Sequence, residues 1–250
     1  MRKAALFSPI SLALSLLVSA GAAAARPSVV VELYTAQGCA SCGKANAHVA
    51  ELAETPGVLA LTFSVDYWDY LGWADTFAKP EFAQRQKAYV TKLSLREPYT
   101  PQVVVDGAAQ ASGAKPDRID KLVADARKAP RNPPDIRFAR GRVQVGSARS
   151  PRGGGEVWLI RYDPRAQEVA VKSGDNKGQT LPEKNVVRDL VRLGAWRGQP
   201  VSFRLPAPSE EALKTVVLVQ AAHGGRVIGA GEPQGAKLPH AKSQGSKPAA

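Results

Sequence analysis

Both cysteines of the chain lie in the stretch YTAQGCASCGKAN, where two residues separate Cys39 from Cys42. This C-x-x-C spacing is typical of thiol-disulfide exchange or metal binding rather than of long-range crosslinking. If a helix begins near Cys39, unpaired backbone N–H groups and the helix dipole stabilise a thiolate there. Cys39 is then the expected nucleophile, and Cys42 is expected to resolve the mixed disulfide formed at Cys39.

Two other roles of the cysteine pair stay open. A structural disulfide over so short a loop stabilises a protein by only about 2 kcal/mol. A metal site has only His48, His223 and His240 as further imidazole ligands, and zinc-type spacing is absent from the sequence. We therefore expect a redox-active disulfide, no metal and no bound cofactor.

The segments around the cysteines predict alternating strands and helices. Val29 to Val31 open a buried strand that ends at Tyr34, and a helix follows from near Cys39 to the residues before Pro56. Further elements are expected as strand 58–65, helix 80–93, strand 102–107 with an Asp-Gly hairpin turn, strand 108–112 and helix 116–128. The predicted order is β-α-β-α-β-β-α.

The Pro-rich segment APRNPPD, residues 129–135, predicts a boundary between two domains. Beyond it, short strand-like runs occur near 136–145, 156–163, 167–173, 200–205, 215–220 and 226–230. Such spacing indicates a small antiparallel β-sandwich over residues 135–231. The segment NVVRDLVRLG fits a strand or a helix, and its surroundings favour a strand.

The β-α-β-α-β-β-α order with C-x-x-C after the first strand resembles the thioredoxin fold. The motifs ELYTAQGCASC, VDYWDYLGWADTFA, RQKAYV, YTPQVVVDG and NVVRDLVRLGAWRG together resemble the exported, thioredoxin-like domain of unknown function 1223 family. This resemblance covers nearly the whole chain after residue 25. It implies an α/β thioredoxin-like domain, residues 26–130, followed by the sandwich.

The sequence departs from the family pattern close to the cysteines. Members tend to have a proline after the second cysteine, an aspartate beyond it, and often a histidine before V-D-Y-W-D. This chain has Gly43, Lys44, Asn46 and Ser64 at those places, so no role is transferred to them.

Two further site residues follow from the resemblance. Thr100-Pro101 resembles the cis-proline turn that presents backbone to a substrate beside the reactive sulfur, with a trans turn as the alternative. Glu32, seven residues before Cys39, resembles the buried acid that takes the proton of the second cysteine in thioredoxins. The alternative for Glu32 is a solvent-facing or paired glutamate.

The aromatic segment DYWDYLGWADTF begins at the end of the second expected strand, an edge where ligands gather in α/β sheets. Its substrate-binding candidates are Asp66, Tyr67, Trp68 and Trp73. An aromatic plug that covers the sheet edge is the equal alternative. Ser112-Gly113 resembles only partly the turn that binds glutathione in glutaredoxins, so glutathione is a possible co-substrate.

The N-terminus has the pattern of a secretory signal peptide over residues 1–25, with Arg2, Lys3 and an apolar run that ends in small residues. Its removal takes two positive charges from the net charge of +12 and leaves +10. The remaining Lys and Arg are scattered, which argues against nucleic acid as a partner. Residues 232–250 are rich in Pro, Gly, Ser and Lys and predict a disordered tail.

These patterns predict an exported, periplasmic or secreted, thiol-disulfide oxidoreductase that acts on an envelope protein or a small thiol, with an unknown redox partner. After signal removal we expect no membrane span. A non-catalytic binding module of the cell envelope, which keeps the fold and uses the aromatic segment to hold a partner, is the competing hypothesis.

Overall fold

The computed structural model describes residues 29–233, so the predicted signal peptide and the tail from residue 234 lie outside the described part. Three α-helices occur in this range: α1 (Cys42–Ala53), α2 (Pro80–Lys92) and α3 (Pro116–Lys128). A short 3-10 helix, η1 (Asp69–Leu71), precedes α2. Proline at the first positions of α2 and α3 fits a helix start, because proline lacks an N–H that would be unpaired there.

Thirteen strands occur in the described range, and nearly all of them coincide with segments predicted as strands. The N-terminal half contains β1 (Val29–Thr35), β2 (Val58–Ser64), β3 (Gln102–Val105) and β4 (Ala109–Ser112). The C-terminal half contains β5 (Ile136–Ala139), β6 (Arg142–Val145), β7 (Gly155–Asp163), β8 (Gln167–Ala170), β9 (Thr180–Glu183), β10 (Val186–Trp196), β11 (Val201–Arg204), β12 (Lys214–Ala221) and β13 (Val227–Gly231). The favoured strand at NVVRDLVRLG is confirmed as β10, whereas β9 was not predicted.

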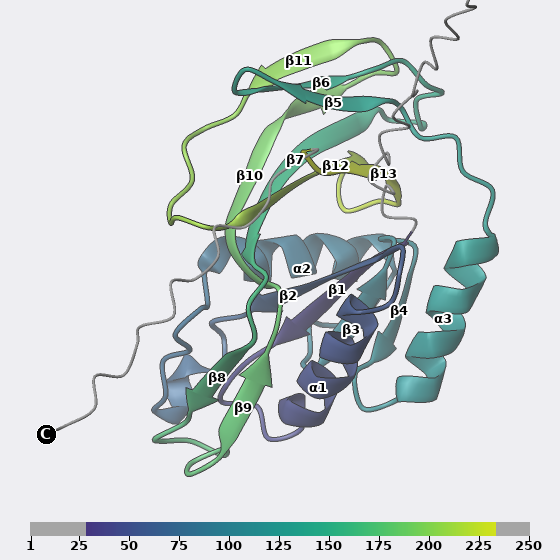
Figure 1. Ribbon diagram of the computed structural model, residues 1–250. Coiled ribbons are helices and arrows are strands. Elements are labelled where there is room, and N and C mark those ends of the chain that lie inside the picture. Colours follow the sequence, from purple (N-terminus) through teal and green to yellow (C-terminus); the bar gives the residue numbers. More distant parts are fainter. Residues whose placement is uncertain (1–28, 234–250) are drawn as a thin grey trace, which may run out of the picture.

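One large sheet of eight strands spans the molecule, in the order β13-β12-β7-β10-β2-β1-β3-β4 (Figure 1). β1 and β2 pair in parallel, and β1 and β3 pair antiparallel. β10 joins the two halves of the sheet, since Val186 pairs with Thr62 of β2 on one side and β7 runs antiparallel on the other. The protein is therefore a mixed α/β fold built on a large sheet with three helices.

The large sheet and one of the three apolar clusters cross the predicted boundary at residues 129–135, whereas the other two clusters each stay on one side of it. Four C-terminal strands continue the sheet that carries the cysteines, and one apolar cluster contains Tyr34 and Phe63 together with Ile160 and Leu218. Local sequence patterns do not reveal this arrangement, because pairing between β10 and β2 depends on contacts far apart along the chain.

The helices cover both faces of the sheet. β1 is buried along its whole length, as expected for a central strand with helices on each side. Val31 and Leu33 face the core shared with α1 and α3, whereas Val30 and Tyr34 face the core shared with α2. Figure 1 shows α1 and α3 together on one side.

The remaining strands form two smaller sheets. β11, β6 and β5 form a three-stranded sheet that packs on the extension of the large sheet through Val143, Val157 and Trp196, among others. β8 and β9 form a hairpin that lies beside α1 (Figure 1). The hairpin brings C-terminal residues to the N-terminal end of α1, where both cysteines are found.

Candidate functional site

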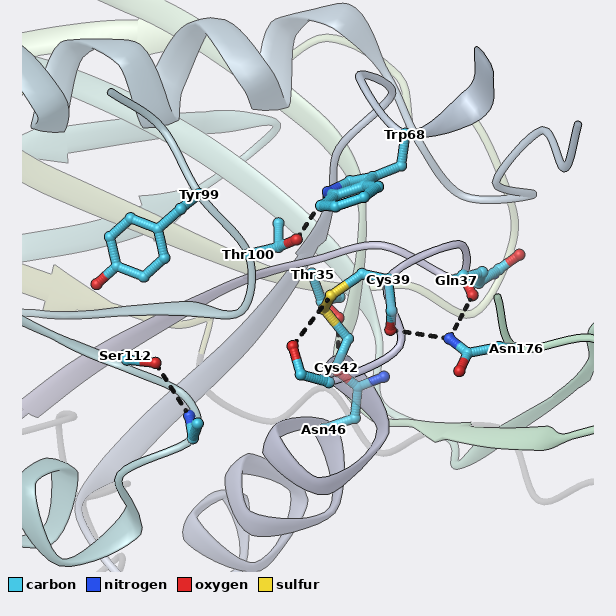
Figure 2. Close-up of a disulfide and its surroundings, with 12 residues drawn as sticks. Thr35, Gln37, Cys39, Cys42, Asn46, Trp68, Tyr99, Thr100, Ser112 and Asn176 are labelled. Atoms are coloured by element: carbon cyan, nitrogen blue, oxygen red, sulfur yellow. Dashed lines mark hydrogen bonds between the residues drawn. A yellow bond between two sulfur atoms is a disulfide. The ribbon is translucent and has the colours of Figure 1, made fainter. Parts of the chain in front are cut away.

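The two cysteines form a disulfide at the beginning of α1 (Figure 2). Their Cα atoms are 5.4 Å apart. Cys42 is the first residue of α1, and Cys39 lies in the turn before it, where its carbonyl accepts the N–H of Cys42 at 3.0 Å. The helix thus begins three residues later than the sequence predicted, and Cys39 precedes the unpaired N–H groups of the first turn.

Both cysteines are almost inaccessible to solvent in this state. Cys39 is 2% exposed and Cys42 is 0% exposed. The Sγ atom of Cys39 has the hydroxyl of Ser41 as a neighbour at 3.7 Å.

Thr100 lies beside the disulfide (Figure 2), and its peptide bond to Pro101 is cis. The indole N–H of Trp68 donates to Oγ1 of Thr100 at 2.7 Å and so joins the aromatic segment to this turn. The carbonyl of Pro101 accepts the N–H of Gly113 at 2.8 Å. A Cβ atom at Gly113 would lie 2.7 Å from both Ala45 and Pro101, so only glycine permits this close packing of α1 on the turn.

The predicted aromatic candidates have separate positions. Trp68 lies over the disulfide and Trp73 donates to the side chain of Gln37 at 2.9 Å. Tyr67 donates to Gln86 of α2 at 3.1 Å, and burial, together with the charge of Asp66, raises the pKa of Tyr67 to about 12. Tyr67 and Trp68 also pack on the apolar core, as the plug alternative expects. Of the four predicted candidates, Trp68 and Trp73 therefore lie at the cysteine loop.

Residues that the sequence analysis did not single out hold the cysteine loop. The side-chain N–H groups of Asn176, in the loop between β8 and β9, donate to the carbonyls of Gln37 and Cys39 at 2.8 Å each (Figure 2). Asn176 is fully buried. The hairpin of the C-terminal half is thereby hydrogen-bonded to the backbone of Cys39.

A pair of buried carboxyl groups lies behind this loop. Asp75 accepts the backbone N–H of Gln37 at 2.7 Å and that of Phe77 at 2.9 Å. Glu183, the last residue of β9, accepts the side-chain N–H of Gln37 at 3.3 Å. Burial and the negative charge of Asp75 raise the pKa of Glu183 to about 8. Burial also raises the pKa of Asp75, although the hydrogen bonds from the two backbone N–H groups act to lower it.

Glu32, predicted as a base for Cys42 with a paired glutamate as the alternative, is a buried, paired glutamate in the structure. Arg85 of α2 binds both oxygens of Glu32, at 2.7 and 2.9 Å, and Tyr34 and Tyr89 donate to the same carboxylate at 2.9 and 2.7 Å. Glu32 projects to the α2 face of β1, as do Val30 and Tyr34, and these donors occupy its oxygens.

Metal ligands do not gather around the cysteines in the described part of the chain. Across residues 29–233, no group of three or more His, Cys, Asp or Glu side chains is arranged to hold a metal ion. Nε2 of His48 lies 3.0 Å from Asp120 on α3.

Within residues 29–233, none of the helices combines the length and apolar character that a membrane crossing needs.

The raised pKa of Glu183 predicts a pH-dependent stability of the oxidised protein. Its usual value is 4.5, so between pH 4.5 and 8 the folded state keeps a proton that the unfolded state has released. The contribution of this retained proton to the stability of the folded state is complete below pH 4.5 and is lost as the pH rises through 8. We expect the free energy of unfolding to fall by about 2 kcal/mol between pH 6 and 8 from this group alone.

Urea unfolding of the oxidised wild type and of Glu183→Gln at pH 6 and 8 measures this contribution, because the disulfide does not titrate and the other groups are common to both proteins. An equal pH dependence in the two proteins would show that Glu183 is not its source.

The fold and the disulfide define a class of mixed α/β proteins with one C-x-x-C pair at a helix start. The chain belongs to the family described as protein of unknown function DUF1223, whose model matches residues 30–220. The crystal structure of protein AGR_C_4864 from Agrobacterium tumefaciens is similar, with 31% identity and a TM-score of 0.68, over 88% of this chain and 100% of that chain. No curated protein matches the sequence.

Proposed function

We propose that this protein is an exported thiol-disulfide oxidoreductase in which Cys39 is the nucleophile and Cys42 is the resolving thiol. The observation that carries the proposal is the Cys39–Cys42 disulfide at the start of α1, with Cys39 in the turn that precedes the helix. Unpaired N–H groups at a helix start favour a thiolate, and a thiolate is the form that attacks disulfides.

The arrangement around the pair supports a thioredoxin-like unit. The elements from β1 to α3 follow the β-α-β-α-β-β-α order, and their strands lie in the order β2-β1-β3-β4. The Thr100–Pro101 turn lies beside the disulfide, where an extended peptide or a small thiol can approach. The substrate is an envelope protein or a small thiol such as glutathione, in keeping with the signal-peptide pattern of residues 1–25.

A non-catalytic binding module is the second candidate function. Two observations favour it. Cys39 is almost fully buried, and a hydrogen bond to Thr100 holds Trp68 over the disulfide. In that case Cys39–Cys42 is an inert crosslink, and the groups over it hold a partner.

Alkylation of the reduced protein tests the proposal. At pH 7 we expect Cys39 to react about tenfold faster than Cys42, because a helix start favours a thiolate at Cys39 and Cys42 is fully buried. Mass spectrometry after brief exposure to iodoacetamide identifies the modified cysteine. Equal rates at the two thiols would contradict a nucleophilic Cys39.

Trapping experiments separate the two candidate functions. Cys42→Ser should retain mixed disulfides with thiols from the native compartment, whereas Cys39→Ser should retain few, because only Cys42 can release what Cys39 has captured. Neither variant can form the Cys39–Cys42 disulfide, so a difference between the two variants does not come from the loss of that bond. If neither variant captures a thiol, the binding module is the better explanation.

A further inference from the structure

The two buried carboxyl groups behind the cysteine loop come from different parts of the chain, and neither is held in an ion pair with another residue of the range 29–233. Glu183 is 1% exposed and Asp75 is 8% exposed. Gln37, two residues before Cys39, contacts both carboxylates through its backbone N–H and its side chain. A pair of like charges in a buried site is costly, so the structure favours one neutral and one ionised carboxyl.

Polar side chains continue from this pair towards Cys42. Ser64 lowers the pKa of both carboxyls, and its hydroxyl oxygen is buried without a hydrogen-bond partner among residues 29–233. Ser64 is in register with Thr35 of β1, whose hydroxyl donates to Asn46 at 2.7 Å. Asn46 lies one helical turn after Cys42, on the same side of α1, and Figure 2 shows Thr35 and Asn46 beside the disulfide.

Several buried polar atoms in this region have no hydrogen-bond partner within residues 29–233: Oε2 of Glu183, Nδ2 of Asn46 and Oδ1 of Asn176. Unpaired polar atoms in a protein interior are costly and call for a physical reason. Glu183 and Asn176 both bond to the segment from Gln37 to Cys39, and Asn46 follows Cys42 on α1, so these polar atoms belong to residues around the cysteine loop.

We propose that Glu183 holds the proton that is exchanged with the sulfur of Cys42 when the disulfide opens and closes. This inference rests on the proposed function and assigns the acid and base of that reaction. The group comes from β9 in the C-terminal half, whereas the carboxyl on β1, Glu32, is bound to Arg85 on the opposite face of the sheet.

The reaction with a dithiol substrate balances as follows. A substrate thiolate attacks Sγ of Cys39, the Cys39–Cys42 bond breaks with both electrons on Cys42, and neutral Glu183 supplies the proton that makes Cys42 a thiol. The second substrate thiolate then displaces Cys39 as a thiolate and closes the substrate disulfide. The substrate loses two electrons, the protein disulfide gains them, and Glu183 regains a proton released by the substrate.

In the opposite direction the carboxylate of Glu183 takes the proton of Cys42, and the resulting thiolate attacks the mixed disulfide at Cys39. The groups that set the charge of Glu183 come from each neighbouring element. Asp75, with Asp69 next to it, lies in the segment before α2, and Arg188 lies on β10. Lys184 pairs with Glu54, and Lys44 of α1 is exposed. A pKa of about 8 keeps Glu183 protonated at neutral pH.

The test is the rate at which dithiothreitol reduces the full-chain protein, measured from pH 6 to 9.5 and corrected for the thiolate fraction of the reagent. We expect the wild-type rate to fall through an inflection near pH 8, where Glu183 ionises. Glu183→Gln should react about tenfold to hundredfold more slowly at pH 7 and lose the inflection. The amide introduced by this substitution still offers an oxygen to Gln37, so the fold is retained.

Two further variants keep the outcome interpretable. Glu168→Gln changes an exposed glutamate of β8 and should react as the wild type does. Asp75→Asn removes the charge that raises the pKa of Glu183, so the inflection should move to lower pH. If Glu183→Gln keeps the wild-type rate and inflection, the inference is overturned while the proposed function stands. If the wild-type disulfide does not exchange at all, both fail.

Discussion

A fragment of residues 26–130 is expected to be unfolded or aggregated, although it contains both cysteines and every element from β1 to α3. Without β10, strand β2 becomes an exposed edge, which invites pairing with other chains. The fragment also lacks Ile160, Val187, Val216 and Leu218, which bury Phe63 and its neighbours in the full chain. Circular dichroism and thermal unfolding of the purified fragment measure this loss.

A fragment of residues 26–233 is the matched control, because it retains all thirteen strands of the described part. We expect it to unfold cooperatively like the full chain. A cooperative transition in the shorter fragment would show that the cysteine-bearing half is an independent domain, as the Pro-rich segment at 129–135 suggested.

Replacing Arg85 by methionine is expected to lower the free energy of unfolding by about 3–5 kcal/mol. The substitution leaves the carboxylate of Glu32 buried without its cation, because Arg85 supplies two of its four hydrogen bonds. It also removes a guanidinium that lies 5.3 Å from the ring centre of Trp158 and 5.4 Å from that of Tyr89. Urea unfolding at pH 7 measures the change.

Two controls separate charge from packing in this experiment. Arg142→Met changes an exposed arginine that bonds to Ser202, and it should alter stability by less than about 0.5 kcal/mol. In Glu32→Gln/Arg85→Met no unpaired charge remains, so part of the stability should return. A loss below about 1 kcal/mol in Arg85→Met would mean that the ion pair is not a major support of the fold.

Local patterns were sufficient to predict most elements of the fold. Each of these elements has a signal in residues next to one another in the sequence. The signals are the β-branched run from Val29 to Val31, the prolines Pro80 and Pro116 at helix starts, and the Asp106-Gly107 turn. Asp106 and Gly107 indeed have φ angles of 50° and 59°, as a tight hairpin turn needs. The cysteine spacing likewise placed Cys39 and Cys42 at the start of a helix.

The parts that could not be predicted depend on pairing between distant segments. Nothing near Glu32 reveals that Arg85, 53 residues later, neutralises it. Nothing near Glu183 distinguishes it from a surface glutamate, since the strand TLPE is short and β9 has no apolar run. Asn176 belongs to a turn-like stretch of Gly, Asp and Lys, and only the folded hairpin brings its amide to Cys39.

The hydrogen bond from Asn176 to the carbonyl of Cys39 joins a residue made late in synthesis to one made early. The two residues are 137 positions apart, so Cys39 leaves the ribosome long before its amide donor has been synthesised. Chains begin to fold from the N-terminus during synthesis. The nascent chain therefore contains both cysteines before the β8–β9 hairpin and Glu183 have been made. A disulfide between Cys39 and Cys42 that forms before β9 has been made therefore forms at a site that still lacks the hydrogen bonds from Asn176.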